Sequence, residues 1–461
     1  MSWSEQQPDL PAGWEWAEFG SLTNTQLGKM LSKVSKTGVD ERPYLRNQNV
    51  QWGRFVLDDL ATMAFTDLEV QKFALEPGDL IVCEGGEVGR AAVWNGPTGV
   101  FYQKALHRVR PLAGLDVRFL MYALRRMTVG DLLDGFTSGS TIAHLPQEDL
   151  RRLPVPVPPA AEQERIVAEL ERRFAHLDAV ERGLSVAARK AQVAHAATLS
   201  AVADGTLLGL DSADWRSVTT GEIADVRGGI QKQPKRAPNN NSHPFLRVAN
   251  VGRGTLDLEV IHQIELFGDE IDTYRLAAGD LLVVEGNGSV EQIGRAAVWD
   301  GSIPDCVHQN HLIRVRPGPD ILPGFLGLTW NAPSTAEQLI AVASSTSGLH
   351  TLSVKKVKSV VIALPDTATQ AKLIAEAERR LSLIDSCSKE IGRSIDRVSA
   401  LRRSLLVAAF SGRLVPQDPD DEPASELLAR IAKTRAEAEA AEKETKAAAR
   451  RANKAAKEKT A

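Results

Sequence analysis

The sequence predicts an α+β protein. We expect two similar, mixed and mainly β domains, separated by two long antiparallel coiled-coil helices in a pseudo-two-fold internal repeat. Three observations predict this arrangement: a duplication at an offset of a little over 200 residues, short β-rich segments inside each copy, and a heptad pattern after each copy. The offset is far too long for a solenoid repeat. It indicates a duplicated domain together with its connecting helix.

Matching motifs establish the duplication. The motif Pro43-Tyr44-Leu45-Arg46 recurs as Pro244-Phe245-Leu246-Arg247. The stretch PGDLIVCEGGEVGRAAVW at 77–94 returns as AGDLLVVEGNGSVEQIGRAAVW at 278–299, with four extra residues at the glycine-rich turn. The predicted parts are a first domain at 1–156, a central helix at 157–207, a second domain at 208–363, a distal helix at 364–413 and a charged, alanine-rich tail at 414–461.

Each domain is expected to consist largely of short strands. The segments rich in β-branched and apolar residues are bounded by Gly, Pro, Asn or Asp, which is typical of strands that end in turns. They are Leu80–Cys83, Ala91–Trp94, Leu281–Val284 and Leu312–Val315. Gly85-Gly86 and Gly286-Asn287-Gly288 stand where one strand must turn into the next.

A long helix follows each domain. The central helix begins after Pro158-Pro159, with Glu162 in its first turn. Counted from Ile166, one seam line contains Ile166, Arg173, Val180, Ala187 and Ala194, and the other contains Leu170, Leu177, Leu184, Ala191 and Thr198. The distal helix gives Leu373, Arg380, Cys387, Ser394 and Leu401, with Ala377, Ile384, Ile391, Val398 and Leu405. Such sustained heptads predict a coiled coil. Arg173 and Arg380 either fix the register or extend along its edge.

The composition excludes several classes of protein. No apolar run is long enough to span a membrane, and the polar start differs from a signal peptide, so we expect a cytoplasmic protein. The three cysteines, Cys83, Cys306 and Cys387, are too scattered for a disulfide framework or zinc site.

Motifs for covalent chemistry are missing from the sequence. The glycine turns lack the GK[ST] of a phosphate-binding loop, and neither HExxH nor GxSxG occurs. Asn331-Ala332-Pro333 does not complete the motif with which amino-methyltransferases hold a flipped base. We therefore expect no catalytic residues, no metal site and no cofactor bound by this chain.

Both domains carry side chains suited to DNA recognition, since Asn and Gln pair bidentately with adenine, Arg and Lys pair with guanine, and Ser or Thr contacts bases or phosphate. The alternative for each is an ordinary turn or surface residue, and for Arg46, Arg90, Arg247 and Arg295 a role in holding the fold. The candidates are Arg46, Asn47, Gln48, Asn49, Arg90, Gln103, Lys104, His107, Ser138, Ser140, Thr141, Arg247, Asn250, Arg253, Asn287, Arg295, Gln309, Asn310, His311, Ser347 and His350.

Together, these motifs and the segments PPAAEQERIV at 158–167 and LRRSLLVAAFSGRLVP at 401–416 resemble the DNA specificity subunit of type I restriction-modification systems. The resemblance covers nearly the whole chain. It implies two target-recognition domains that each read half of a split double-stranded DNA site, with the helices setting the gap. It also implies two methyltransferase subunits that bind S-adenosylmethionine and methylate adenine, and restriction subunits that translocate and cut DNA.

The resemblance further implies that the helices dock the methyltransferase subunits. The residues expected to form the spacer or to dock are Glu162, Gln163, Ile166, Leu170, Leu177, Leu184, Ile384, Ile391, Val398 and Leu405. The second copy departs from the first, because Thr369 replaces Glu162 and Asp366 replaces Pro159. Equal docking by both helices is therefore open.

The charge of the chain limits its DNA affinity. A net charge of −4 is unfavourable for a lone DNA binder, because phosphate neutralisation supplies most non-specific affinity. We therefore expect weak DNA binding by the isolated chain. Two rival functions remain open: a self-contained methyltransferase or nuclease, and an adaptor that holds two proteins. The basic tail is an exposed helix or disordered arm that is either solvated or in contact with DNA or a partner.

Overall fold

The computed structural model describes residues 9–31, 40–112, 114–130, 132–137, 143–287, 289, 292–346, 349–437 and 440. Four candidate DNA-binding residues, Ser138, Ser140, Thr141 and Ser347, lie outside this part of the chain, as does Gly288. The contacts divide the chain into unit 1, which contains 1–182 and 395–461, and unit 2, which contains 183–394. The divisions fall inside the two long helices, so each unit contains one part of each helix.

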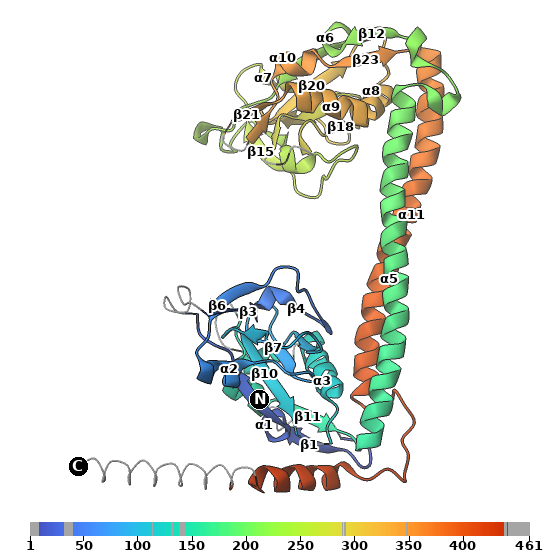
Figure 1. Ribbon diagram of the computed structural model, residues 1–461. Coiled ribbons are helices and arrows are strands. Elements are labelled where there is room, and N and C mark those ends of the chain that lie inside the picture. The colour runs from blue at the N-terminus through green and yellow to red at the C-terminus, as the bar shows by residue number, and fades with distance from the viewer. Residues whose placement is uncertain are drawn as a thin grey trace, which may run out of the picture. The chain divides into compact units, whose positions relative to one another are not determined.

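The centre of unit 1 is an antiparallel sheet (Figure 1). Its strand order is β2 (Thr23–Leu27), β10 (Leu106–Pro111), β7 (Leu80–Cys83) and β8 (Ala91–Val93). A second sheet has the order β6 (Ala61–Ala64), β3 (Glu41–Leu45) and β9 (Phe101–Tyr102), in which β3 and β9 are parallel. Two strand pairs complete the unit: β1 (Glu15–Glu18) with β11 (Pro154–Val157), and β4 (Val50–Gln51) with β5 (Arg54–Phe55). Its shorter helices are α1 (Phe19–Leu22), α2 (Asp67–Phe73), α3 (Val117–Val129) and α4 (Gln147–Arg152).

Unit 2 repeats this plan. Its sheets are β13 (Ala224–Gly228), β20 (Leu312–Pro317), β16 (Leu281–Val284) and β18 (Ala296–Val298), and then β15 (His262–Glu265), β14 (Ser242–Leu246) and β19 (Val307–His308). Strand β12 (Arg216–Thr219) pairs with β23 (Val361–Leu364), and a further sheet contains β17 (Gly286–Asn287), β22 (Leu349–Thr351) and β21 (Ser344–Thr346). Its shorter helices are α6 (Thr220–Ile223), α7 (Glu270–Tyr274), α8 (Pro323–Trp330), α9 (Pro333–Val342) and α10 (Val354–Lys358). The duplication predicted from the motifs is confirmed as a duplication of strand order.

The repeated Gly-Asp-Leu motif anchors the central sheet of each unit. Asp79 is buried and accepts from the Arg110 Nε at 2.5 Å, and Asp280 accepts in the same way from Arg316 at 2.7 Å. Each aspartate also accepts a backbone N–H three residues before it, from Glu76 and Ala277. The motif is therefore shared because it fixes the strand edge where β7 and β16 begin.

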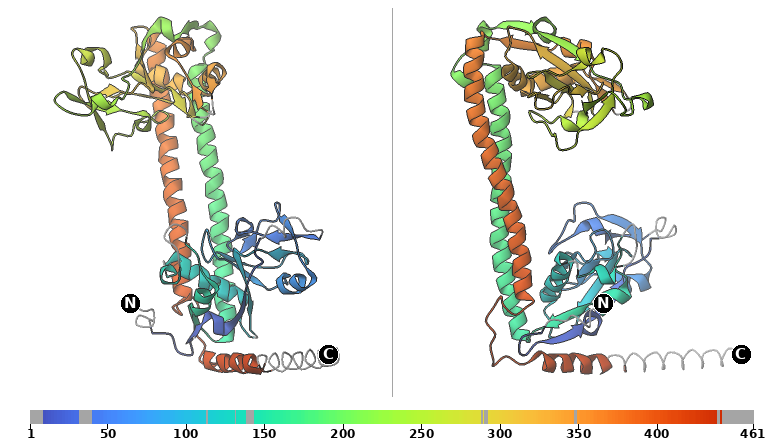
Figure 2. Two further views of the ribbon diagram at one scale, coloured as in Figure 1. Left: turned by 90° about the vertical axis from the view of Figure 1, so that its left-hand side faces the viewer. Right: turned by 180° about the vertical axis from the view of Figure 1, so that it is seen from behind.

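The two long helices, α5 (Ala160–Ala203) and α11 (Thr367–Ala409), pack against each other in opposite directions. In unit 1, Arg402 near the end of α11 pairs with Asp178 of α5 at 2.5 Å. In unit 2, Val202 near the end of α5 shares a core with Leu373 and Ala377 at the start of α11. Figure 2 shows the two helices side by side from further directions. The predicted antiparallel pair is confirmed.

One of the two predicted seam lines is displaced by one residue. The line through Leu170, Leu177 and Leu184 is buried or half-buried, as expected. The other line passes through Phe174, which is 6% exposed, rather than through Val180, which is 38% exposed. The predicted line through Ile166 is wrong because Ile166 and Val167 are both buried, and the line seven residues apart that stays buried runs from Val167 to Phe174.

The same displacement occurs in α11. Arg402, half-buried, lies on the seam line, whereas Leu401 is 52% exposed and Cys387 is exposed. Arg173 and Arg380 lie outside the seam and pair along their own helices with Glu169 and Glu376. They do not fix the register, whereas Arg402 contacts Asp178 and Glu181 of the opposite helix.

The first part of the tail is not an exposed arm. Residues 424–437 are helical, and Ala424, Leu427 and Ile431 are buried in unit 1. The Ala424 N–H donates to the Gly13 carbonyl at 2.9 Å, and Arg435 donates to the Gly20 carbonyl at 2.8 Å. The helical spacing of three apolar residues in a charged segment was the signal that the composition concealed.

Two negative findings apply to the described ranges. No helix there is both long and apolar enough to cross a membrane. No group of three or more His, Cys, Asp and Glu side chains there could hold a metal ion. The cysteines are free, with Cys83 and Cys306 buried.

Candidate nucleic-acid interface

Asn49 and Asn250 are equivalent scaffold residues. The Asn49 Oδ1 accepts from the backbone N–H of Arg46 at 2.8 Å, and its Nδ2 donates to the carbonyls of Val56 and Asp59. Asn250 does the same with Arg247, Asp257 and Val260. Both are buried. Their amides therefore hold a loop closed in each unit and are already satisfied without a base.

Arg90 and Arg295 also bind the chain internally. The Arg90 Nη2 donates to the Asn47 carbonyl at 2.9 Å, and the Arg295 Nε donates to the Val251 carbonyl at 2.8 Å. Asn47 in turn donates to the Gly85 carbonyl at 2.9 Å. These contacts join the loop after β3 or β14 to the central sheet. They support the alternative that residues common to both copies hold the fold.

The equivalent arginines at 46 and 247 have different surroundings. The Arg46 Nη2 donates to the Asp59 Oδ2 at 2.9 Å, and Gln48 donates to the same carboxylate at 3.1 Å. Val260 occupies the position of Asp59 in unit 2. In the described part of the chain, the Arg247 side chain makes no ion pair or hydrogen bond. The duplicated arginine is thus neutralised in unit 1 alone.

The turns before β10 and β20 place further candidates on one scaffold. The backbone N–H of Lys104 donates to the Lys29 carbonyl at 2.8 Å, and that of Asn310 donates to the Ile230 carbonyl at 2.9 Å. Gln103 and Gln309 precede them and are half-buried. Lys104 is exposed and so is His311, whose Nδ1 lies 3.0 Å from the Glu285 Oε2.

His107 does not face solvent. Its Nε2 lies 2.9 Å from the Leu145 carbonyl and its side chain is fully buried. Burial lowers the pKa of His107, against a weaker opposing effect of the Leu145 carbonyl. The structure places it inside unit 1, away from any nucleic acid at the surface.

Three further candidates lie in unit 2. Asn287 in β17 pairs through its backbone with His350 in β22, and His350 is half-buried. Arg253 is half-buried, and burial followed by the charge of Arg295 lowers its pKa. A surface cavity of about 690 Å³ beside β17 is lined by His311, Gly286, Thr351 and Lys356 among others.

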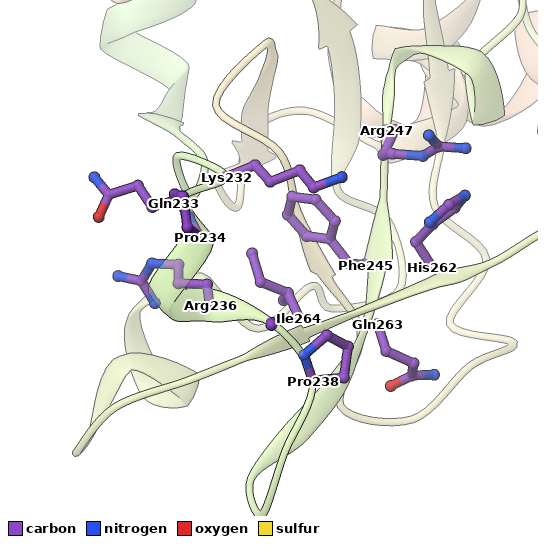
Figure 3. Close-up of a pocket in the computed structure, with 11 residues that line it drawn as sticks. Lys232, Gln233, Pro234, Arg236, Pro238, Phe245, Arg247, His262, Gln263 and Ile264 are labelled. Carbon is purple, nitrogen blue, oxygen red and sulfur yellow. The ribbon is translucent and has the colours of Figure 1, made fainter.

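A second cavity, of about 560 Å³, lies at β14 and β15 in unit 2 (Figure 3). We call it the β14–β15 pocket. Its polar lining comes from Lys232, Gln233, Arg236, Arg247, His262 and Gln263, and its apolar lining from Pro234, Ala237, Pro238, Phe245 and Ile264. Of these, only Arg247 was a candidate. The basic run Gln231–Arg236 was the missed signal.

The expected docking residues are mostly covered within the chain. Glu162 and Gln163 are buried, and Gln163 donates to the Pro158 carbonyl at 3.0 Å. The seam residues Ile166, Leu170, Leu177 and Val398 are buried, while Leu184, Ile384, Ile391 and Leu405 are half-buried. They lie along the packed helix pair, and their roles in setting the DNA gap and in docking stay predictions.

The chain is similar to one known protein domain in its first part and to known proteins over most of its length. Residues 11–186 match the family model "Type I restriction modification DNA specificity domain". The EcoKI specificity subunit of Escherichia coli is 26% identical over 93% of this chain and 96% of its own length. The StySPI specificity subunit of Salmonella potsdam is 24% identical over 88% of this chain and 90% of its own length.

The first part of the chain is thus similar to the type I DNA specificity domain, and relatives that span most of its length are type I specificity subunits. Solved structures agree on the fold. A chain from a structure of the type I restriction-modification system superimposes with a TM-score of 0.69 at 18% identity, over 88% of this chain and all of that chain. The HsdS subunit of Thermoanaerobacter tengcongensis gives 0.51 at 18% identity, over 89% of this chain and all of its own.

Proposed function

We propose that this chain is the non-catalytic, DNA-reading specificity subunit of a type I restriction-modification complex, in which each unit reads one half of a bipartite target. One observation carries the assignment of reading to both units. The turns at Lys104 and Asn310 are held by the same backbone hydrogen bond, at 2.8 and 2.9 Å, yet they present different side chains. A shared scaffold with different polar groups suits two readers of different sequences.

The shared polar residues are poor candidates for base contacts. Asn49, Asn250, Arg90 and Arg295 use their polar atoms inside their units. We assign sequence reading instead to polar positions that differ between the copies. These are Gln48, equivalent to Ala249, the mutually equivalent Lys104 and Asn310, and His311, equivalent to Ala105. Gln48 and His311 contact the carboxylates of Asp59 and Glu285, but both side chains are exposed.

Methyltransferase subunits are proposed as the partners, and S-adenosylmethionine is then their cofactor. In this arrangement they supply adenine methylation, and restriction subunits supply translocation and cleavage. The seam of α5 and α11 is occupied by the opposite helix, so partners would meet its outer faces. Val186, Val193 and Leu383 lie there and are 56%, 64% and 58% exposed. Such apolar residues on a helical surface suit an interface with another protein.

The proposal is tested by selecting bound duplexes from a random library with the complex assembled on the full chain. The expected product is one motif with two specific parts and a constant gap. Exchanging residues 20–150 for those of another family member should change one part and leave the other. A change in both parts, or in neither, would show that the units do not read independently.

Absence of any sequence preference would contradict the proposal as a whole and favour an adaptor role. Methyl transfer by the purified chain alone would instead favour the enzyme alternative. A variant with Asn310→Ala offers the local test, because its backbone hydrogen bond to Ile230 is retained. It should relax the sequence preference in one part of the motif by about 10-fold, or about 1.4 kcal/mol, which lies within the about 1–3 kcal/mol of one base contact.

A further inference from the structure

The two units differ at one equivalent pair of positions that carries charge. The Asn49 Nδ2 donates to the Asp59 carbonyl at 3.1 Å, and the Asn250 Nδ2 donates to the Val260 carbonyl at 3.1 Å. These hydrogen bonds place residues 59 and 260 at equivalent points of the corresponding loops in the two units. The backbone is therefore conserved between the units while a carboxylate is replaced by an isopropyl group.

The replacement determines the state of the neighbouring arginine. In unit 1, the Arg46 Nη2 lies 2.9 Å from the Asp59 Oδ2. In unit 2, within the described residues, no carboxylate pairs with Arg247. The Nε of both arginines is buried without a partner, so the difference lies at the outer nitrogens of the guanidinium group.

The β14–β15 pocket surrounds this unpaired guanidinium with cations and donors. Lys232 and Arg247 both line the pocket, and Figure 3 shows the Lys232 chain extending across Phe245 toward Arg247, with His262 beside Arg247. Among the described residues that line the pocket, none is acidic. Arg236 contributes little net charge, because Glu270 accepts from both of its outer nitrogens at 2.7 Å.

This donor set favours a ligand that only accepts hydrogen bonds. Lysine and arginine have several N–H donors and no acceptor. The O6 and N7 edge of guanine also only accepts, but it carries no charge, whereas the two cations Lys232 and Arg247 favour an anion. A phosphodiester has acceptor oxygens and a negative charge. We propose that the β14–β15 pocket of unit 2 binds one phosphodiester of the DNA backbone, and that the equivalent position of unit 1 does not. The inference rests on the proposed DNA-reading function and assigns an unequal share of backbone binding to the two units.

The test is the salt dependence of binding to a mixed-sequence DNA duplex, measured with the full chain assembled with its partner subunits. Val260→Asp supplies the carboxylate that unit 1 has, at a position that is 63% exposed and so tolerates a polar side chain. Arg247→Gln removes the cation itself. Each should reduce the slope of log affinity against log salt by about 0.9, the value for one phosphate contact.

Arg46→Gln is the matched control, because it removes the same charge from the equivalent position. It should leave the slope unchanged, since Asp59 already neutralises Arg46. Thermal unfolding identifies any variant that has lost its fold, and Lys232→Gln then serves as a second probe, because Lys232 is exposed.

An unchanged slope in folded Val260→Asp and Arg247→Gln would overturn the inference. A loss confined to one DNA sequence would also overturn it, because it would indicate a base contact. These outcomes are separable from failure of the proposed function. If the unaltered complex selects a target while the variants keep its slope, the phosphate site alone is wrong; if the complex selects no target, the reading function is wrong.

Discussion

The Trp14 indole donates to the Glu162 Oε2 at 2.9 Å, and both side chains are buried although 148 residues separate them in sequence. This hydrogen bond joins the chain before β1 to the first turn of α5. In unit 2 the equivalent Trp215 packs on Phe325 with ring centroids 6.5 Å apart, and Thr369, in the place of Glu162, donates to Asp366. The departure between the copies thus concerns how each helix is anchored to its own unit.

Glu162→Gln should stabilise unit 1 at neutral pH. Burial raises the pKa of Glu162 against the opposing effects of Trp14 and Arg165. A carboxyl with a raised folded-state pKa favours folding below its ordinary pKa of about 4.3 and loses that contribution as pH rises through the folded value. Glutamine keeps an acceptor for Trp14 without the charge. Urea unfolding at pH 7 and pH 4 should show an advantage for the variant only at pH 7; a variant less stable at pH 7 would contradict this.

Phe174→Ala should be far more damaging than Arg173→Ala. Phe174 is buried in the seam and contacts Tyr122, with ring centroids 5.7 Å apart. Its truncation is expected to cost about 3–5 kcal/mol. Arg173 is exposed and pairs with Glu169 within its own helix, so its loss should cost less than about 1 kcal/mol. Thermal unfolding of the two variants checks the corrected seam, and comparable costs would restore the original heptad.

Arg110→Ala and Arg316→Ala should each destabilise a different unit. Each leaves a buried aspartate, Asp79 or Asp280, without its ion-pair partner. The expected cost is about 3 kcal/mol, at the low end for a broken buried pair because each arginine is partly exposed. Hydrogen exchange resolved along the sequence should show faster exchange in β7 for the first variant and in β16 for the second. Loss of protection in both units from one substitution would contradict two separate cores.

Adding one heptad to each helix should lengthen the gap in the DNA target. Insertions of seven residues after Leu184 and Ile391 keep the line through these residues in register. Each adds about 10.5 Å of helix, or roughly three base pairs of DNA. The same step rotates one half-site around the duplex, so low activity is acceptable. Any surviving activity should recognise unchanged half-sites with a longer gap; full activity on the original gap would mean that the helices do not set it.

The repeated scaffold could be predicted from sequence because its motifs are local. Pro43–Arg46 and the Gly-Asp-Leu segment each lie at one strand edge; the first recurs with Phe245 in place of Tyr44, and the second recurs unchanged. The seam line was wrong by one residue because Ile166 and Val167 are both buried, which a heptad pattern alone does not separate.

The candidate site was less accessible to sequence reasoning. Asn47 is a DNA-binding candidate by residue type, but its Nδ2 donates to the carbonyl of Gly85, 38 residues away. Lys232 and His262 were missed because strand pairing, with Phe245 opposite His262, brings them into one pocket from separate parts of the chain. Side chains that satisfy each other at long range look identical in sequence to side chains left free for a ligand.

The most direct measurement of the reading function is methylation-sensitive long-read sequencing of DNA from the source cell, with the chain intact and with it removed. The intact cell should show adenine methylation at one bipartite motif with a fixed gap, and removal should abolish methylation at that motif alone. Restoring the chain with Asn310→Ala should return methylation with relaxed preference in one half of the motif. Methylation that persists unchanged without the chain would contradict its role as the subunit that selects the DNA target.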